Sequence, residues 1–211
     1  MKLLRVLLIA VPALASAGEQ PSQSGVASAH FRATEVGQQI LNQGGNAFDA
    51  AVAVSAALAV VEPASSGLGG GGFWLLHRAA DDRDVFVDGR EQAPAAANRD
   101  MYLDEAGEVD RDLAINGPLA AGIPGQPAAL VHMADKYGEL PLAESLAPAI
   151  RLAREGFAVD DKYHRLMQWR REVLLRWEAA PEVFLDEGEV PAVGTIIRQP
   201  DLAATLARIA E

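Results

Sequence analysis

The residues best suited to chemistry in this sequence lie just after a short apolar stretch. Residues 85–87 read Val-Phe-Val and predict a strand, and Asp88, Gly89, Arg90 and Glu91 follow it directly. A guanidinium presents a planar fork that pairs with a carboxylate through two parallel hydrogen bonds, whereas the ammonium of lysine lacks that fork. Arg90 is therefore a candidate for binding a carboxylate group, and Glu91 either orients it or is a solvated acid. From these residues alone, the favoured interpretation is a surface ion pair with Asp88 or Glu91, which contributes about 0–1 kcal/mol.

A glycine-rich segment lies upstream of that strand. Gly67, Gly69 and Gly72 match the pattern G-x-G-x-x-G, but a dinucleotide site needs a strand before the pattern and a helix after it. Here an apolar helix precedes the pattern and an apolar strand follows it, so we reject nucleotide binding. A flexible linker is the second interpretation.

We favour a third interpretation of this segment, in which the loop is packed so closely that Cβ atoms would clash. Its exposed backbone N–H groups could also stabilise an oxyanion. Packing is the favoured role for each residue, and the candidates for the floor of a site are Ser65, Ser66, Gly69, Gly70 and Gly71.

Composition excludes several classes of function. The formal net charge is -11, which disfavours nucleic acids and anionic membranes as partners, because both require clustered positive charge. The sequence has no cysteine, so disulfides and thiolate metal sites are excluded. Its 4 histidines have no metal-ligand spacing, and we expect no structural metal. Since 50% of the residues are hydrophobic, the chain can bury a core.

The first 17 residues have the three parts of a secretory signal peptide. Lys2 and Arg5 supply the positive region, residues 3–14 are mostly apolar, and Ala15-Ser16-Ala17 offers a cleavage site. The apolar run is too short to span a hydrocarbon layer of about 30 Å. We expect cleavage after Ala17, residues 18–211 as the working part, no stable membrane association afterwards, and a periplasmic or secreted location.

The pattern of apolar residues predicts helices and one hairpin. Asn46 is a typical N-cap, Gly44 and Gly45 end the helix before it, and Pro63 ends the helix after it. That second helix is apolar on all sides, so it must be buried. The predicted helices span residues 34–42, 47–61, 126–137, 142–155, 160–177 and 201–211. The predicted strands span residues 25–29, 73–76 and 85–87, the last two forming a hairpin. This order of elements predicts a sheet covered by helical layers.

Several motifs together resemble the γ-glutamyltranspeptidase family. They occur in family order and cover nearly everything after the signal peptide, at residues 44–53, 61–73, 88–94, 122–125 and 148–157. The sequence departs locally from the family at Ala64, where histidine is frequent, and at Trp74, where an aliphatic residue is common. These departures alter packing without breaking a motif.

The resemblance implies an α+β fold, the αββα sandwich of N-terminal-nucleophile hydrolases, of which this sequence holds only the N-terminal part of the large subunit. It also implies a precursor that cleaves itself, a threonine nucleophile at the start of the small subunit, and no cofactor. That threonine is expected beyond Glu211, so residues 18–211 alone should be inactive. By the same resemblance, Arg90 holds the α-carboxylate of the γ-glutamyl group of glutathione and related compounds.

Two alternatives to a glutathione hydrolase remain open at this stage. One is a related acylase that acts on β-lactam side chains or on poly-γ-glutamate, since such relatives share this framework. The other is a truncated remnant or a non-catalytic binding protein, because the sequence lacks the nucleophile. Arg90 favours a substrate with a free α-carboxylate, but it does not fix the acyl acceptor.

Overall fold

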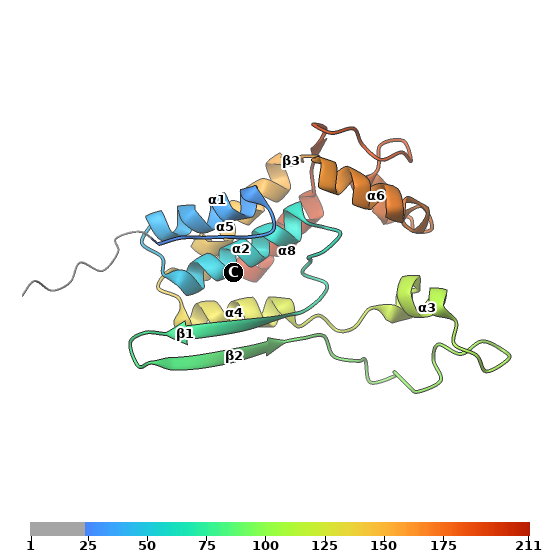
Figure 1. Cartoon of the computed structure of the whole chain (residues 1–211), viewed down its shortest axis with the longest axis horizontal. Coiled ribbons are helices and arrows are strands. Elements are labelled where there is room, and N and C mark those ends of the chain that lie inside the picture. Colours follow the sequence, from blue (N-terminus) through green and yellow to red (C-terminus); the bar gives the residue numbers. More distant parts are fainter. Residues whose placement is uncertain (1–23) are drawn as a thin grey trace, which may run out of the picture.

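The structure is a computed structural model that describes residues 24–211 (Figure 1), so the predicted signal peptide lies outside the described residues. Its helices are α1 (Phe31–Asn42), α2 (Ala47–Val61), α3 (Arg111–Asn116), α4 (Gln126–Tyr137), α5 (Leu142–Glu155), α6 (Asp161–Leu174), α7 (Ala179–Phe184) and α8 (Pro200–Ala210), with a 3-10 turn η1 (Pro118–Ala120). Its strands are β1 (Gly72–Arg78), β2 (Arg83–Gly89), β3 (Phe157–Ala158) and β4 (Ile196–Ile197).

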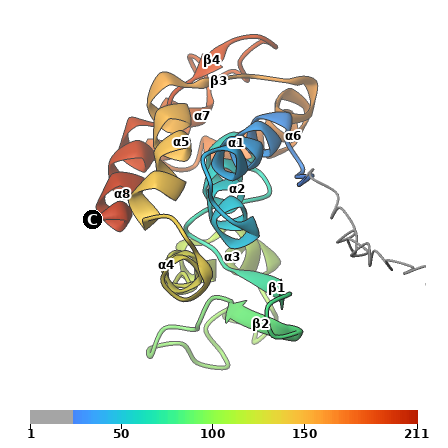
Figure 2. The same cartoon turned by 90° about the vertical axis from the view of Figure 1, so that its left-hand side faces the viewer.

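Helix α2 lies at the centre of a group of packed helices. It contacts α1, α4 and α5, and α8 packs against α5 (Figures 1 and 2). Val52 and Val60 of α2 are fully buried, together with Ile40 of α1 and Leu146 of α5. The small alanine side chains of α2 allow these helices to approach closely, and the prediction of a buried helix over residues 47–61 is confirmed.

The start of α2 is held by a buried carboxylate. Asp49 is fully buried, and its Oδ2 accepts hydrogen bonds from the backbone N–H of Asn46 at 2.9 Å and of Glu139 at 3.0 Å. Its Oδ1 accepts from the N–H of Leu140 at 3.3 Å. The Asn46 side chain caps α2 and donates to the carbonyl of Tyr137 at 2.7 Å. One capping motif therefore also fixes the connection between α4 and α5.

Strands β1 and β2 form an antiparallel hairpin that packs against α4. The two faces of this hairpin differ. Leu76 and Val87 are buried on the face toward the helices, where the indole of Trp74 donates to the Ser55 hydroxyl at 3.2 Å. The opposite face is exposed and carries three large apolar side chains, Phe73, Leu75 and Phe86. Of the implied αββα sandwich, residues 24–211 thus supply helices and one hairpin, without a second sheet stacked on it.

Helices α6 and α7 and the small sheet of β3 and β4 lie at the other end of the helical group (Figure 1). A polar cluster joins them to α1 and α2. Lys162 of α6 donates to both carboxylate oxygens of the buried Glu62, at 2.8 and 2.7 Å. The ring of His30 caps α1, and its Nε2 lies 3.7 Å from Asp160. Burial of His30 lowers its pKa.

Some predicted boundaries were wrong. Residues 25–29 form no strand, and α1 begins at Phe31 rather than at residue 34, because the ring of His30 accepts a hydrogen bond from the N–H of Arg32 and starts the helix earlier. Helix α6 ends at Leu174 rather than at residue 177. No helix among the described residues is both long and apolar enough to cross a bilayer.

Candidate functional site

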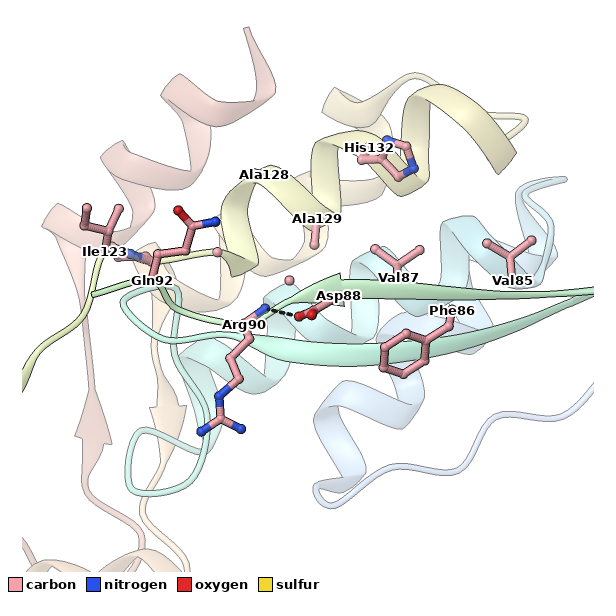
Figure 3. Close-up of a pocket in the computed structure, with 13 residues that line it drawn as sticks. Val85, Phe86, Val87, Asp88, Arg90, Gln92, Ile123, Ala128, Ala129 and His132 are labelled. Atoms are coloured by element: carbon pink, nitrogen blue, oxygen red, sulfur yellow. Dashed lines mark hydrogen bonds between the residues drawn. The ribbon is translucent and has the colours of Figure 1, made fainter. Parts of the chain in front are cut away.

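A groove of about 670 Å³ runs along β2 and α4. Figure 3 shows the groove and the side chains around it. Five consecutive residues of β2 line it, so it runs along the unpaired edge of that strand. Helix α4 and the turn before it complete the wall, and the lining residues are 85–90, Gln92, 123–125, Ala128, Ala129 and His132.

Arg90 lies at one end of this groove but its guanidinium does not point into it. Figure 3 shows the side chain extending away from Ala129 and His132, on the side of the hairpin that also carries Phe86. The guanidinium carbon lies 5.8 Å from the centroid of the Phe73 ring. The competing ion-pair interpretation is not what the structure shows, because Asp88 accepts a hydrogen bond from the backbone N–H of Arg90 at 3.0 Å, and no described carboxylate forms an ion pair with the guanidinium.

The backbone at Arg90 is enclosed by two glycine-containing segments. A Cβ added to Gly71 would lie 2.6 Å from the carbonyl oxygen of Gly89 and 2.8 Å from the Cα of Arg90. A Cβ added to Gly125 would clash with the carbonyl oxygens of the same two residues. The prediction of a glycine loop too tightly packed to admit side chains is therefore confirmed at Gly71.

Backbone hydrogen bonds join these segments into one unit. The carbonyl of Gly70 accepts from the N–H groups of Gly125 and Gln126, both at 3.2 Å. Gln92 and Ile123 exchange two backbone hydrogen bonds, at 3.1 and 2.8 Å. Main-chain hydrogen bonds thus hold together the end of β2, the glycine loop and the turn before α4. The exposed side chain of Arg90 extends from this unit.

Glu91 is exposed, and its side chain runs between the two glycine segments. A Cβ at Gly122 would lie 2.9 Å from the Cβ of Glu91, and one at Gly70 would lie 3.3 Å from its Oε1. The described residues show no hydrogen bond between Glu91 and the Arg90 guanidinium, so its role in orienting Arg90 stays a prediction.

The candidate floor divides into two parts. Gly70 and Gly71 contact the segment of Arg90 and Glu91, as described above. Ser66 and Gly69 instead line a second groove of about 490 Å³, whose other walls are residues 182–184 and 198–202. Ser65 is exposed in the turn after α2, where its N–H donates to the carbonyl of Glu62 at 2.9 Å. The sequence grouped these five residues because they are adjacent, but the chain turns between Gly69 and Gly70.

Two features of the site were missed by sequence reasoning. Phe73 was treated only as the first residue of a strand, although its ring is the nearest aromatic neighbour of the Arg90 guanidinium. Gly125 was counted only as part of the family motif at residues 122–125, and its contact with Gly89 joins residues 36 positions apart in the chain. Gly-Ile-Pro-Gly is typical of a tight turn, but nothing local identified its partner. Residues 24–211 contain no cluster of acids and histidines that could hold a metal ion.

A comparison with models of protein families identifies the family of this chain. A family model described as gamma-glutamyltranspeptidase matches residues 33–211. The chain belongs to the γ-glutamyltranspeptidase family. The glycine loop, the Asp88–Glu91 segment and the turn before α4 all lie within the matched residues, so the family resemblance seen in the motifs is confirmed.

Two curated relatives of this γ-glutamyltranspeptidase-family chain are glutathione hydrolase proenzymes. It is 45% identical over 190 residues to the glutathione hydrolase proenzyme of Escherichia coli, a match that covers 90% of this chain and 33% of the relative. It is 40% identical over 181 residues to the glutathione hydrolase proenzyme of Bacillus subtilis, covering 85% of this chain and 31% of the relative. The chain thus spans about a third of the length of the curated relatives it matches.

Solved structures confirm the predicted fold class. Helicobacter pylori γ-glutamyltranspeptidase superposes with a TM-score of 0.85 at 40% identity, over 89% of this chain and 54% of that one. Related proteins with other names are also similar. The transpeptidase CapD of Bacillus anthracis has a TM-score of 0.74 at 34% identity, over 89% of this chain and 58% of its own. A cephalosporin acylase of Bacillus halodurans has a TM-score of 0.73 at 32% identity, over 85% of this chain and 34% of its own.

Proposed function

We propose that this chain forms the N-terminal part of the large subunit of a γ-glutamyltransferase and glutathione hydrolase. In this proposal Arg90 binds the α-carboxylate of the γ-glutamyl donor. The observation that carries it is the contrast at Arg90, whose backbone is enclosed by Gly71 and Gly125 while its guanidinium has no carboxylate partner among residues 24–211. A fixed cation with free hydrogen-bond donors is suited to bind a carboxylate ligand.

The proposed reaction is acyl transfer from a γ-glutamyl amide. A threonine hydroxyl attacks the amide carbonyl, and the free α-amine of the same threonine takes the hydroxyl proton and passes it to the amide nitrogen. The C–N bond then breaks, the amine product leaves, and the γ-glutamyl group stays on the threonine as an ester. Water or an amino-acid acceptor then attacks the ester and releases the γ-glutamyl group. This chain contributes the anchor: Arg90 would hold the far end of the glutamyl group, so that the γ-carbonyl is presented to a nucleophile from the small subunit. These steps need no cofactor.

The proposal includes self-cleavage and export. Relatives named as proenzymes support synthesis as a precursor, with the small subunit as the permanent partner of this chain. We propose that residues 1–17 direct export, that cleavage follows Ala17, and that the product is periplasmic or secreted. The net charge of -11 supports a small-molecule substrate such as glutathione rather than a nucleic acid or a membrane surface.

The test is to incubate the full-length protein with a chromogenic γ-glutamyl anilide and to follow self-cleavage on a denaturing gel. We expect two subunits on the gel and release of the aniline, and glutathione should compete with the anilide. A processed protein that releases no aniline contradicts the proposal.

A second candidate is an acylase with a different acyl group, which the likeness to CapD and to the cephalosporin acylase favours. The same preparation should therefore be given a cephalosporin with an acyl side chain and a poly-γ-glutamate chain. Faster turnover of either substrate than of the γ-glutamyl anilide would favour this second candidate over a glutathione hydrolase.

A further inference from the structure

We propose that Phe73 is a positioning residue for Arg90, and that its ring, backed by Phe86, holds the guanidinium where a carboxylate can bind it. The proposal rests on the proposed function, because it assigns Phe73 a role in binding the donor that Arg90 anchors. It goes beyond that function by naming a residue of β1 that touches no reacting atom.

The geometry places the aromatic pair next to the guanidinium. The rings of Phe73 and Phe86 are stacked, with centroids 5.5 Å apart and planes inclined by 26°. The guanidinium carbon of Arg90 lies over the Phe73 ring at 5.8 Å. In the hairpin register Phe73 lies opposite Asp88, whose carboxylate accepts the hydrogen bond from the backbone N–H of Arg90. The two strands thus hold both ends of Arg90, the backbone through Asp88 and the side chain through Phe73.

Packing among residues 24–211 does not account for the position of the Phe73 ring. Phe73 is 53% exposed and Phe86 is 60% exposed, on the face of the hairpin turned away from the helices. An aromatic ring that is half exposed in the described part of the chain adds little to the core beneath it. Among the described residues, the ring has an aromatic contact with Phe86 and a cation–π contact with the Arg90 guanidinium.

The physical effect of the ring is to restrict a long side chain before the ligand arrives. A cation is attracted to the negative face of an aromatic ring within about 6 Å of its centroid. The N–H groups of the guanidinium, which a carboxylate needs, are not hydrogen-bonded to any other residue that the structure describes. An arginine already held in place loses less rotamer freedom on binding, and affinity rises accordingly. The ring should therefore affect donor binding and leave the acyl-transfer step unchanged.

The experiment measures KM and kcat for the γ-glutamyl anilide with the full-length, processed protein. The change Phe73→Leu removes the aromatic face and keeps an apolar side chain. It should raise KM about two- to fivefold, the effect expected for loss of an exposed cation–π contact, with kcat unchanged. Phe73→Tyr keeps the aromatic face and should retain the wild-type KM.

The chain offers a matched control at the start of α1. Phe31 is 60% exposed, and the Arg32 guanidinium lies 5.1 Å from its ring centroid. This pair has the same chemistry but lies outside the site, so Phe31→Leu should leave both KM and kcat unchanged. Melting curves for all variants check that each protein folds.

A double-mutant cycle separates positioning from a merely structural role. If Phe73 acts through Arg90, then Phe73→Leu should add little to the KM of an Arg90→Gln variant, which has no cation to interact with the ring. Additive effects of the two changes overturn the proposal, and so does a Phe73→Leu variant with wild-type KM while Arg90→Lys raises KM. A wild-type protein without γ-glutamyl activity overturns the proposed function itself, and this inference with it. Loss of kcat alone in Phe73→Leu also counts against positioning.

Discussion

Asp49 and Arg90 are both charged residues in glycine-containing motifs, but they differ in burial and in hydrogen bonding. Asp49 is fully buried, and its carboxylate accepts three backbone hydrogen bonds from two segments of the chain. Arg90 is exposed, its backbone is enclosed, and its guanidinium has no carboxylate partner among the described residues. The carboxylate of Asp49 is therefore used within the fold, whereas the guanidinium of Arg90 keeps its hydrogen-bond donors free among the described residues.

This contrast shows how to separate structural from functional residues within one family motif. A charge whose hydrogen-bonding capacity is used internally contributes to stability. A charge whose backbone is fixed but whose side-chain donors are free is available to a ligand. Loss of Asp49 should therefore affect folding, whereas loss of Arg90 should affect substrate binding, and the following four predictions test this division.

The largest effect is expected for Asp49→Ala. This change leaves three backbone N–H groups without their acceptor, and each unsatisfied buried donor costs about 1–3 kcal/mol, so the free energy of unfolding should fall by roughly 3 kcal/mol or more. Denaturant titration of the variant measures this loss. Asp135→Ala, an exposed acid on α4, is the control and should change stability little. Equal losses of unfolding free energy in the two variants would contradict a structural role for Asp49.

The next largest effect is expected for Arg90→Lys, on binding rather than on stability. Lysine keeps the charge but lacks the planar fork, and a hydrogen bond to a charged group contributes about 1.5–3 kcal/mol. The KM for γ-glutamyl substrates should therefore rise about tenfold or more. Arg83→Lys, at the exposed start of β2, is the control and should leave KM unchanged. An unchanged KM in correctly processed Arg90→Lys protein would remove Arg90 from the site.

A smaller effect is expected for Gly71→Ala, a change that should affect both the stability of the fold and the position of Arg90. A Cβ there meets the backbone of Gly89 and Arg90, and overpacking of this kind costs about 1–3 kcal/mol. Because the segment that carries Arg90 must move, KM should rise as stability falls. Gly69→Ala in the same loop is the matched control, since a Cβ there meets nothing within 4 Å. If both variants behave alike, the enclosure of Arg90 by backbone is not what positions it.

The smallest effect is expected for His30. Because this residue is buried, protonation of its ring should lower the free energy of unfolding of the protein. Burial lowers its pKa in the folded protein below the ordinary 6.5, so the unfolded chain takes up the proton first as the pH falls. Stability should be full above about pH 6.5 and should decline as the pH falls through the folded pKa. The charges that modify this pKa are Asp160 and Glu62, which raise it, and Lys162 and Arg32, which lower it.

The test for His30 is the denaturation midpoint measured between about pH 8 and pH 5. His30→Asn retains an N-cap acceptor for α1 but does not titrate in this range, so its midpoint should vary less with pH than that of the wild type. The same slope in both proteins would show that another group is responsible.

Sequence reasoning succeeded where the determining interactions are local. The start of α2 followed from Asn46 as N-cap, and the bounds of α4 and α5 followed from apolar spacing and the glycines that end them. It failed where a side chain with weak local preference decides the boundary, as His30 does for α1. The two-residue strands β3 and β4 are too short to show an alternating pattern, so nothing in the sequence predicted them.

The residues of the candidate site were proposed from the sequence, but the contacts between them were not predictable from it. Arg90 and the glycine loop were identified from residue type and from the family motifs. The partners of the loop lie far along the chain, as with Gly70 and Gly125, and only the fold brings them together. For the same reason, nothing local identified the hydrogen bonds that Asp49 accepts from the backbone of Glu139 and Leu140, about 90 positions away.

The enclosure of Arg90 has a consequence for how this scaffold can be altered. Gly71, Gly89 and Gly125 meet through main-chain atoms, and that junction makes no demand on the side chain at position 90. A combinatorial library at position 90 could therefore exchange the recognition chemistry while the surrounding architecture persists. Directed evolution toward other acyl groups should tolerate broad variation at this position and almost none at Gly71 and Gly125.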